Sequence, residues 1–460
     1  ASIGSAVGLG NIWGFPYKMG KSGGAVFLLL YLVLVVLVGV TVMLGELALG
    51  RRSGKSAVST YRGLSKKYTW LGYAGIVCGF CIMCFYFVLG GIVLRYAVGY
   101  FLAIFGGSEF AWSGQGTGFF GYFLTDTNSM ILFFVLYILL NILVVSGGVQ
   151  GGIEKFCKIG MPALFVMLLI VIIYVACQPG AGGGYKFMFG WNIEPLKEDF
   201  LKVLKTAAGQ MFFSLSLGMG AMITYGSYLK KQESVQKNAV IIVICDTVVA
   251  IMAGMIVMPA CYAFLGGETS SGPGLLFLSM QIVFEKMGYV GNIMGFLFYA
   301  LVFIAAISSS FSLLEVITSF KVDQNVEKGK APGRKKYAII AAILVFVFAL
   351  PVALDGLGSG VAGGATIDYP AAMLGIDKQT WSGDWLDFYD MLSEGIMMPL
   401  GAMIMAFAIG WIWKIDMVVE ECEQSGHKFW GKVFFDICYK LITPIGMAFV
   451  LYAQITDYFS

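Results

Sequence analysis

The 460-residue sequence predicts an all-α protein that crosses a membrane many times. Apolar residue types make up 58% of the chain and charged types only 12%, whereas soluble domains are about a quarter charged. The apolar residues gather in stretches that approach or exceed the roughly 20 residues needed to cross a bilayer core. Lys and Arg concentrate in every second loop between these stretches. The net charge of +3 is too small to indicate a nucleic-acid partner.

Eleven stretches qualify as membrane spans, and the first of them is interrupted by glycines. They lie at residues 1–22, 25–49, 70–106, 128–147, 159–178, 200–229, 238–265, 291–320, 337–354, 386–413 and 433–457. The first span begins within an apolar segment and without an initiator Met. We therefore expect further residues to precede Ala1.

The distribution of Lys and Arg predicts how the spans are oriented. One set of loops holds 20 Lys and Arg; these loops lie at 50–69, 148–158, 229–238, 320–336 and 414–432. The alternate set holds 4; these loops lie at 107–127, 179–199, 266–290 and 355–385. Because cytoplasmic loops are enriched in Lys and Arg, the first set is predicted to be cytoplasmic. The prediction is a multi-pass protein of the plasma membrane with its N-terminus inside and its C-terminus outside.

Two of the predicted spans contain glycines and small polar residues near mid-membrane. The first reads "GSAVGLGNIWGFP" and the sixth reads "GQMFFSLSLGMGAMITYG". Unsatisfied backbone costs several kcal/mol per group in lipid, so a helix break survives where it lines a cavity or binds something. Either stretch alone could serve only close helix packing. Their places, first in each group of five spans, instead predict a five-plus-five inverted repeat with a binding site between the breaks. The repeats would cover residues 1–180 and 199–413, with an extra helix at 432–460.

Three motifs carry a resemblance to a known family: "AVGLGNIWGFPY", "GQMFFSLSLGMGAMITYGSY" and "AAISSSFSLLE". With them, the sequence resembles the neurotransmitter:sodium symporter family over essentially its whole length. Eleven spans match a bacterial subgroup of that family. The resemblance implies a LeuT-type fold with one additional C-terminal helix. It also implies no enzymatic activity, and sodium-driven uptake of an amino acid by alternating access.

The resemblance also implies which residues bind. The substrate residues are Ala6, Gly8, Leu9, Gly10, Ile82, Tyr86, Phe213, Ser214, Ser216, Met219, Ser309, Ser312 and Leu313. The first sodium site would consist of Ala6, Asn11, Ser214 and Asp246, completed by the substrate carboxylate. The second would consist of Gly4, Val7, Ala305, Ser308 and Ser309. Two sodium ions are therefore the expected cargo beside the substrate.

Asp246 and Glu46 are acidic residues within predicted spans, where a carboxylate costs about 2.5 kcal/mol or more unless it is satisfied. Asp246 stands where family members that need no chloride have a fixed acid, so we expect transport without chloride. A hydrogen-bonded structural acid is the alternative for Asp246. Glu46 is expected to cap amides exposed by the break in the sixth span, and Glu315 could serve similarly.

The expected outer gate departs from the family pattern. The family has Arg or Lys at the position of Gly14, paired with an acid that corresponds to Asp390. Lys18 lies one helical turn further on and could reach Asp390. Arg95 is a second candidate, and a water-bridged gate without an ion pair is the third. Tyr86 and Phe213 are expected to close over the substrate, and Tyr228 matches an inner-gate tyrosine.

The substrate itself is predicted from the shape of the site. Family members that carry monoamines have Asp at the position of Gly8, so Gly8 indicates an amino acid. Met219 adapts to varied shapes, and Gly90 and Gly91 would make the pocket roomy. We expect a neutral, apolar or aromatic amino acid, with a small aliphatic one as the alternative.

Several other functions remain to be weighed against this one. A channel or a non-transporting amino-acid sensor of the same architecture is one rival, and proton coupling through Asp246 or Glu46 is a narrower one. An intramembrane enzyme has little support because the only histidine, His427, falls in a predicted cytoplasmic loop. Cys78, Cys81 and Cys84 share a helix face but have no evident fourth metal ligand. The expected partners are a small amino acid and the lipid bilayer, whereas the oligomeric state is not predicted.

Overall fold

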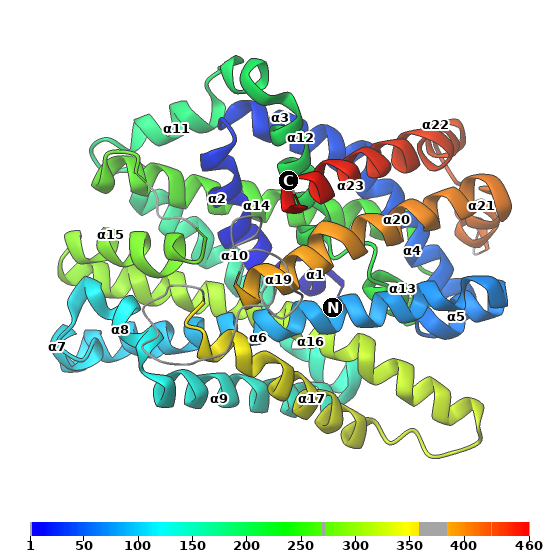
Figure 1. Ribbon diagram of the computed structural model, residues 1–460, viewed down its shortest axis with the longest axis horizontal. Helices are drawn as coiled ribbons and strands as arrows, with labels where there is room; N and C mark the ends of the chain where they lie inside the picture. Colours follow the sequence, from blue (N-terminus) through cyan, green and yellow to red (C-terminus); the bar gives the residue numbers. More distant parts are fainter. Residues whose placement is uncertain (1, 269–271, 358–383, 425, 460) are drawn as a thin grey trace.

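The computed structural model describes residues 2–268, 272–357, 384–424 and 426–459 (Figure 1). These ranges contain helices and their connections, and no strand. Nine helical stretches in them are long and apolar enough to cross a membrane. They are Ala25–Ser53, Lys66–Gly106, Thr127–Ser146, Val149–Ala176, Val235–Leu265, Tyr289–Glu327, Arg334–Leu354, Trp385–Ile412 and Lys432–Thr456. The two predicted spans that are missing from this set are the interrupted ones, and most of the predicted loop at 355–385 lies outside the described residues.

The first predicted span is divided into three short helical pieces. Helix α1 (Ser2–Ala6) ends before a bend at residues 7–8, and a π-helical turn η1 (Gly10–Gly14) leads into α2 (Phe15–Lys21). Pro16 lies where η1 passes into α2 without a break. The break therefore falls in the middle of the predicted span.

The sixth predicted span is divided in the same way. Helix α12 (Glu194–Leu215) ends at Ser216, whose φ of +54° is left-handed. The chain passes Gly218 at φ +80° and Gly220 at φ +76° before α13 (Ala221–Gly226) begins. Glycine adopts positive φ without the steric cost that other residues carry. The two glycines thus allow the gap between α12 and α13.

Long helices around the two breaks form the body of the protein. Helices α6 (Thr69–Gly106) and α16 (Tyr289–Glu327) have the most extensive contact of any helix pair, and α9 (Thr127–Ser146) packs on α6. A Cβ at Gly90 would lie 2.2 Å from the ring of Tyr137, and one at Gly91 would lie 2.9 Å from the backbone of Phe134. The expectation that these glycines enlarge the substrate pocket is therefore wrong, because they let α9 approach α6.

The remaining spans complete the bundle. They are α3 (Ala25–Leu34) with α4 (Val40–Ser53), α10 (Glu154–Ala176), α14 (Val235–Leu265), α17 (Arg334–Leu354), α19 (Trp385–Asp390) with α20 (Met398–Phe407), and α22 (Lys432–Ile437) with α23 (Thr443–Phe459). In Figure 1 the long helices run across the view. This parallel arrangement is what a bundle of spans requires.

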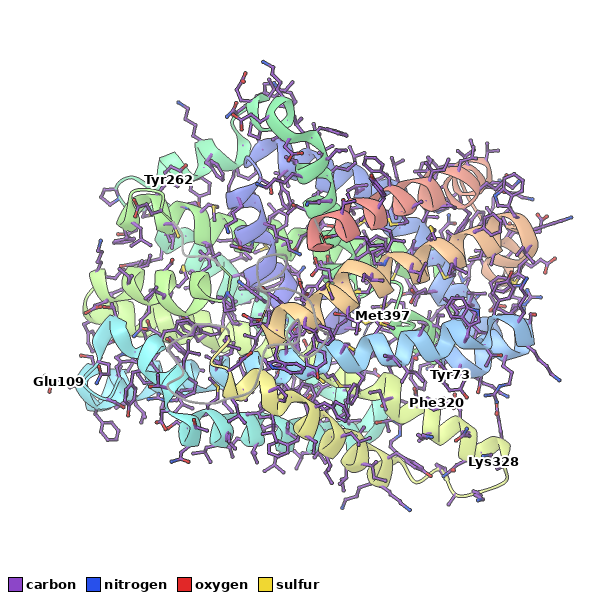
Figure 2. All side chains as sticks on the ribbon, viewed as in Figure 1. Tyr73, Glu109, Tyr262, Phe320, Lys328 and Met397 are labelled. Carbon is purple, nitrogen blue, oxygen red and sulfur yellow. The ribbon has the colours of Figure 1, made fainter. Side chains whose placement is uncertain are left out.

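Short connecting helices gather at the two ends of the bundle. In Figure 1, α7 (Ser108–Ala111), α8 (Phe119–Thr125) and α15 (Met280–Lys286) lie at the left end, and α5 (Ala57–Leu64) and α21 (Asp416–Glu423) at the right end. The same division is visible in Figure 2, where Glu109 marks the left end and Lys328 the right end. The loops rich in Lys and Arg thus share one end of the molecule.

Candidate substrate and sodium sites

Backbone groups freed by the first break are held by side chains from other turns. The N–H of Gly8 donates to Asn11 Oδ1 at 2.8 Å, and the N–H of Leu9 donates to Tyr86 Oη at 3.0 Å. The carbonyl of Gly10 accepts from Gln210 Nε2 at 2.7 Å. Free N–H groups at a helix start suit a negative ligand group. The hydroxyl of Tyr86 lies beside this backbone and can donate its own proton.

The second break is fixed by an acid. The N–H of Gly218 donates to Glu46 Oε1 at 2.7 Å, and the Glu46 side chain is buried. A Cβ at Gly218 would lie 2.1 Å from the carbonyl oxygen of Met398, so the unwound segment is also pressed against α20. The carboxylate thus satisfies an N–H that would otherwise be unpaired in an apolar interior.

A cavity lies between the two breaks. It is lined by Ser5, Ala6, Gly8, Gly10, Ile82, Tyr86, Phe213, Ser216, Met219, Ser309, Ser312 and Leu313. Eleven of the thirteen predicted substrate residues are among them. The other two lie close by: Leu9 reaches Tyr86 through its backbone, and Ser214 bonds Asn11. The cavity measures only about 20 Å³, which is room for about one water molecule. A substrate therefore needs side chains to move.

Gly8 is the position where the cavity leaves no room for a side chain. A Cβ there would lie 2.4 Å from Ser309 Oγ and 2.7 Å from Tyr86 Oη. An Asp at this position would therefore displace both hydroxyls. The geometry disfavours the carboxylate that would pair with an amine lacking a carboxylate of its own.

Asn11, Ser214 and Asp246 meet in one cluster, although they come from three different segments. The Asn11 amide donates to Ser214 Oγ at 2.9 Å and to Asp246 Oδ1 at 2.7 Å. The Ser214 hydroxyl donates to Asp246 Oδ2 at 2.9 Å, and all three residues are buried. The Ser214 hydroxyl and the Asp246 carboxylate are oxygen donors that suit a hard cation, whereas Asn11 turns its amide nitrogen toward them and its oxygen toward Gly8. Ala6 lies at the end of α1 and lines the adjoining cavity.

The second predicted set joins α1 to α16. The Ser309 hydroxyl donates to the carbonyl of Val7 at 2.9 Å and to that of Gly4 at 3.3 Å. The Ser308 hydroxyl donates to the carbonyl of Ala305 at 3.0 Å. Three carbonyls and two hydroxyls thus come together, all buried and without a formal charge. Carbonyls at unwound helix ends and hydroxyls are donors that bind sodium in transporters.

An aromatic side chain closes one side of the cavity. The ring of Phe213 is stacked on that of Phe85, with centroids 6.3 Å apart and an interplanar angle of 20°. A Cβ at Gly10 would lie 2.7 Å from the Phe213 ring. Phe213 therefore covers the backbone of the first break.

The ion pair that Lys18 forms differs from the one expected at the outer gate. Lys18 pairs with Glu394 and not with Asp390, which lies one turn earlier on the same helix. The reason begins at Gly14, where a Cβ would lie 2.8 Å from Gln210 Oε1. Gln210 fills the space of the expected cation, so the cation and its acid partner both lie one turn further along their helices.

Arg95, the other predicted cation, has different contacts. Its guanidinium donates to the carbonyl of Ala111 at 2.8 Å and lies 4.5 Å from the centroid of the Phe119 ring. It therefore connects α6 to the short helices α7 and α8. These contacts place Arg95, the second candidate for the gating cation, against Ala111 and Phe119 instead.

Tyr228 lies in a separate cluster at the other end. Its hydroxyl donates to Glu315 Oε1 at 2.7 Å, and Arg334 lies 2.5 Å from Glu315 Oε2. Glu315 is fully buried, whereas Tyr228 is 41% exposed. A cavity of about 390 Å³ opens beside Tyr228, lined also by Ser2, Cys157 and Tyr225. The cluster thus borders a cavity that extends toward α1.

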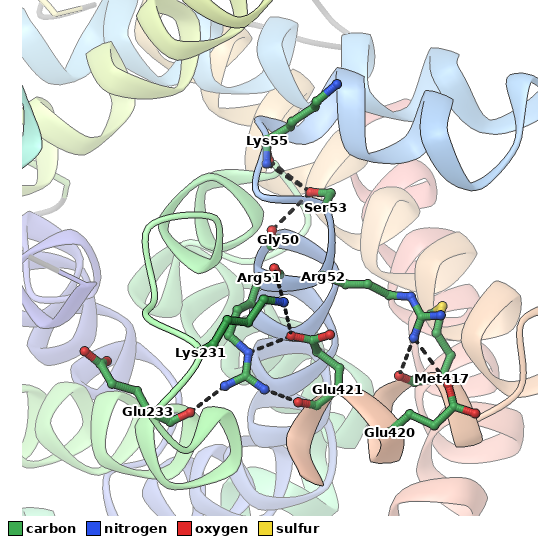
Figure 3. A network of polar contacts seen from close by, with 10 residues as sticks. All are labelled: Gly50, Arg51, Arg52, Ser53, Lys55, Lys231, Glu233, Met417, Glu420 and Glu421. Carbon is green, nitrogen blue, oxygen red and sulfur yellow. Dashed lines mark hydrogen bonds and ion pairs between the residues drawn. The ribbon is translucent and has the colours of Figure 1, made fainter. Parts of the chain in front are cut away.

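A larger polar network lies near this cluster (Figure 3). Arg51 at the end of α4 bonds Glu421 of α21 through Nε at 2.7 Å and through a second nitrogen to the Glu421 carbonyl. Arg51 also donates to the carbonyl of Glu233, and Lys231 lies 3.0 Å from Glu421 Oε1. We call these four residues the inner network. It connects α4, the segment after α13, and α21.

Sequence reasoning missed four residues that take part in these sites. They are Ser5, which lines the cavity, Gln210, which holds Gly10, Tyr225, whose hydroxyl lies 2.8 Å from Ser312 Oγ, and Glu394, the partner of Lys18. Gln210 and Glu394 could have been recognised from the sequence, because polar residues within spans are functional candidates. Ser5 and Tyr225 had none beyond their nearness to the breaks.

Comparisons with known proteins agree with this geometry. The family model described as "Sodium:neurotransmitter symporter family" matches residues 1–119 and 123–376. The chain is 30% identical over 461 residues to the uncharacterized sodium-dependent transporter YhdH of Bacillus subtilis (strain 168), covering 98% of this chain and 94% of the relative. It is also 30% identical to an uncharacterized sodium-dependent transporter of Haemophilus influenzae, covering 96% and 93% of the two chains.

A solved structure is similar over nearly the whole length. The crystal structure of MhsT in complex with L-phenylalanine matches with a TM-score of 0.84 and 34% sequence identity, covering 98% of this chain and 97% of that one. This likeness supports the LeuT-type arrangement of the helices. The chain belongs to the sodium:neurotransmitter symporter family and is a sodium-dependent membrane transporter rather than an enzyme.

Proposed function

We propose that this transporter imports a neutral, hydrophobic or aromatic amino acid together with two sodium ions and without chloride. The observation that carries the proposal is the cavity at Gly8, between two helix breaks and flanked by two clusters of buried oxygen donors. Alternating access would expose this cavity first to one side of the membrane and then to the other.

The amino acid would bind by its two charged groups at the breaks. Its carboxylate would replace Tyr86 Oη as the acceptor at the N–H of Leu9, accept from the N–H of Gly10, and accept from Tyr86 Oη. Its ammonium group would face carbonyls near Phe213 and the hydroxyl of Ser216. The lack of space beside Gly8 supports this orientation of the substrate. It disfavours an acidic side chain at position 8, so the substrate would supply its own carboxylate.

The first sodium ion would lie at Asn11, Ser214 and Asp246, with the substrate carboxylate as a further ligand. The Asn11 amide nitrogen now contacts the Ser214 and Asp246 oxygens. Turning the amide would present Oδ1 to a cation held by the same oxygens. The shared carboxylate would couple substrate binding to sodium, and the fixed charge of Asp246 would make chloride unnecessary.

The second ion would lie among Gly4, Val7, Ala305, Ser308 and Ser309. The Ser309 proton that now points to two carbonyls would turn away, leaving five oxygens for the ion. Because α1 supplies the carbonyls and α16 the hydroxyls, the ion would hold these helices together. Its release would free α1 to move.

Two ions suffice to drive uphill uptake. A tenfold sodium gradient supplies about 1.4 kcal/mol per ion, and a potential of 100 mV supplies about 2.3 kcal/mol per charge. With tight coupling, two ions and a neutral substrate yield about 7 kcal/mol, enough for roughly 10⁵-fold accumulation.

The substrate side chain would contact Ile82, Met219 and Leu313, which are apolar. The related transporter MhsT was crystallised in complex with L-phenylalanine, and this supports an aromatic substrate here. The described cavity is too small for such a side chain, so Met219 and Phe213 would have to shift. A small aliphatic amino acid remains the second candidate, favoured by the small cavity.

We also propose the orientation and the repeats. The end that carries α5 and α21 would face the cytoplasm because its loops are rich in Lys and Arg. The protein would lie in the plasma membrane with the C-terminus outside, and residues 1–180 and 199–413 would form the inverted repeats. The broken helices α1–α2 and α12–α13 stand first in each, which supports this division.

A binding screen of the twenty amino acids, with and without sodium, tests the proposal. Sodium-dependent binding of phenylalanine, tyrosine, tryptophan or leucine is expected, whereas preference for glycine or alanine would support the second candidate. Uptake into proteoliposomes follows, with sodium or choline outside and with chloride replaced by gluconate. Binding without accumulation would favour a sensor. Loss of uptake when gluconate replaces chloride would contradict chloride independence. Uptake driven by a pH gradient alone would favour proton coupling.

A further inference from the structure

A second cavity lies far from the transport site, where the last two spans meet the membrane boundary. It measures about 520 Å³ and is lined by Trp411, Lys414, Asp416, Lys432, Asp436 and Lys440, among others. The spans Trp385–Ile412 and Lys432–Thr456 end and begin there. The cavity therefore lies at the level where lipid head groups are found.

Its charges are only partly balanced. Lys432 lies 2.5 Å from Asp416, and Lys440 lies 2.7 Å from Asp436. Within the described residues Lys414 has no ion-pair partner, and its φ of +64° is left-handed. Three lysines and two carboxylates leave one positive charge. The pKa of Asp416 is held below its usual range, first by Lys432 and then by Lys414 and Lys440, so the three lysines act at one place.

A polar atom in the cavity wall has no partner. Asp436 Oδ1 is buried and accepts no hydrogen bond from the described residues, whereas Oδ2 is occupied by Lys440. A buried acceptor without a donor is unfavourable. A ligand that offered a hydroxyl beside its anionic group would satisfy both Asp436 and the spare lysine charge.

Apolar side chains lead from the cavity along the membrane-facing surface. Trp411 is 55% exposed and Val433 is 74% exposed, and Trp411 donates through Nε1 to the Lys440 carbonyl at 3.1 Å. The exposed apolar residues Ile437, Leu441 and Ile445 follow Val433 at intervals of four along α22 and α23. Tryptophan is enriched at membrane interfaces. An amphiphile with a charged head in the cavity could lay its chains along this surface.

We propose that this cavity binds the head group of an anionic glycerophospholipid, with its phosphate at Lys414 and a head-group hydroxyl donating to Asp436. Basic pockets between spans are a known way of holding such lipids. The apolar surface that begins at Val433 favours a lipid over a soluble phosphate. The site is independent of the transport cavity, so its test requires no knowledge of the substrate.

Native mass spectrometry of the full chain, titrated with phosphatidylglycerol or phosphatidylcholine, tests the site. The variant Lys414→Asn removes the charge and keeps a residue that tolerates positive φ. It should weaken phosphatidylglycerol binding about fivefold, since one lysine near the membrane contributes about that factor, and leave phosphatidylcholine binding unchanged. The matched control Lys335→Asn removes an exposed lysine from the same end of the molecule and should change neither.

Three outcomes would overturn the proposal. Equal weakening by Lys414→Asn and Lys335→Asn would mean a general charge effect, and no weakening would mean no site at Lys414. Displacement of phosphatidylglycerol by an equal concentration of free glycerol phosphate would identify a soluble ligand instead. Thermal unfolding of both variants is measured in the same detergent. This measurement distinguishes a misfolded variant from one that has lost lipid binding.

Discussion

The two ends of the molecule are held by ion pairs of very different kinds. At the end proposed to face outward, Lys18 forms an ion pair with Glu394, and the two side chains are 20% and 10% exposed. At the end proposed to face the cytoplasm, Arg51 and Glu421 are each 1% exposed, and Lys231 and two carbonyls share their bonds (Figure 3). A buried charge that loses its partner costs far more than an exposed one. The outer contact is thus suited to opening repeatedly, whereas the inner network is suited to staying closed.

The inner end also contains a contact that resembles the outer one. Tyr228 is partly exposed and bonds the buried Glu315, which Arg334 neutralises. If the inner network is a permanent tie, opening at this end must occur at Tyr228, where the cavity toward α1 lies. Four predictions test this comparison, from the largest expected effect to the smallest.

Removing the acid of the inner network should have the largest effect. Glu421→Ala leaves the Arg51 guanidinium buried without its carboxylate, which costs about 3–5 kcal/mol. We expect a strongly lowered apparent unfolding temperature in detergent and poor yield of folded protein. Near-normal unfolding would mean that the network is not a tie, and the comparison between the two ends would fail.

Removing the Tyr228 hydroxyl should open the inner end without unfolding the protein. Tyr228→Phe deletes a hydrogen bond to a charged group, a contribution of about 1.5–3 kcal/mol. Cys157 lines the adjoining cavity and is 5% exposed, so its reaction with a polar thiol reagent should become at least tenfold faster. Cys177 is an exposed internal reference whose reactivity should stay constant. Unchanged labelling of Cys157 would show that Tyr228 does not close this cavity.

Breaking the outer pair should change transport more than stability. Lys18→Met removes a partly exposed ion pair, which contributes about 1 kcal/mol, so the apparent substrate affinity should change about fivefold while the unfolding temperature stays nearly constant. The exchange Lys18→Glu with Glu394→Lys should restore transport if pairing is what matters. Unchanged uptake by Lys18→Met would remove Lys18 as a gate.

The surface pair beside the inner network should have the smallest effect. Arg52 lies 3.5 Å from Glu420, with side chains 41% and 68% exposed. Glu420→Ala should shift the free energy of unfolding by less than about 0.5 kcal/mol. Because Glu420 is the neighbour of Glu421, this variant measures how much the free energy of unfolding changes when an exposed acid is removed from the same helix. An effect comparable to that of Glu421→Ala would show that burial does not explain the difference between the ends.

The pattern of apolar stretches and glycines in the sequence was sufficient to predict the arrangement of spans and breaks. Apolar length sets where a helix can cross a bilayer. Within the described residues, nine continuous spans and two interrupted ones agree with the eleven predicted. The glycines near Gly8 and Gly218 indicated where backbone would be free, because only such positions tolerate a break within a span. Nearly all predicted substrate residues line the cavity for the same reason.

Contacts between distant segments could not be predicted from the sequence. Gly90 and Gly91 were expected at the pocket but face α9, because a glycine in a sequence does not reveal which neighbour approaches it. Ser5 lines the cavity, yet nothing in its local sequence distinguishes it from a packing serine. The size of the cavity also depends on side-chain packing that no span pattern contains.

The sequence by itself determined the membrane class, the spans, the breaks and the residue types around them, since these follow from local hydropathy and backbone preference. Only the tertiary structure decided that Lys18 pairs with Glu394, because Gln210 fills the space at Gly14 and moves the contact by one turn. It likewise decided that Arg51, Lys231 and Glu421 meet. Such pairings depend on how helices are placed against one another, and the free energy of a charge depends on that burial.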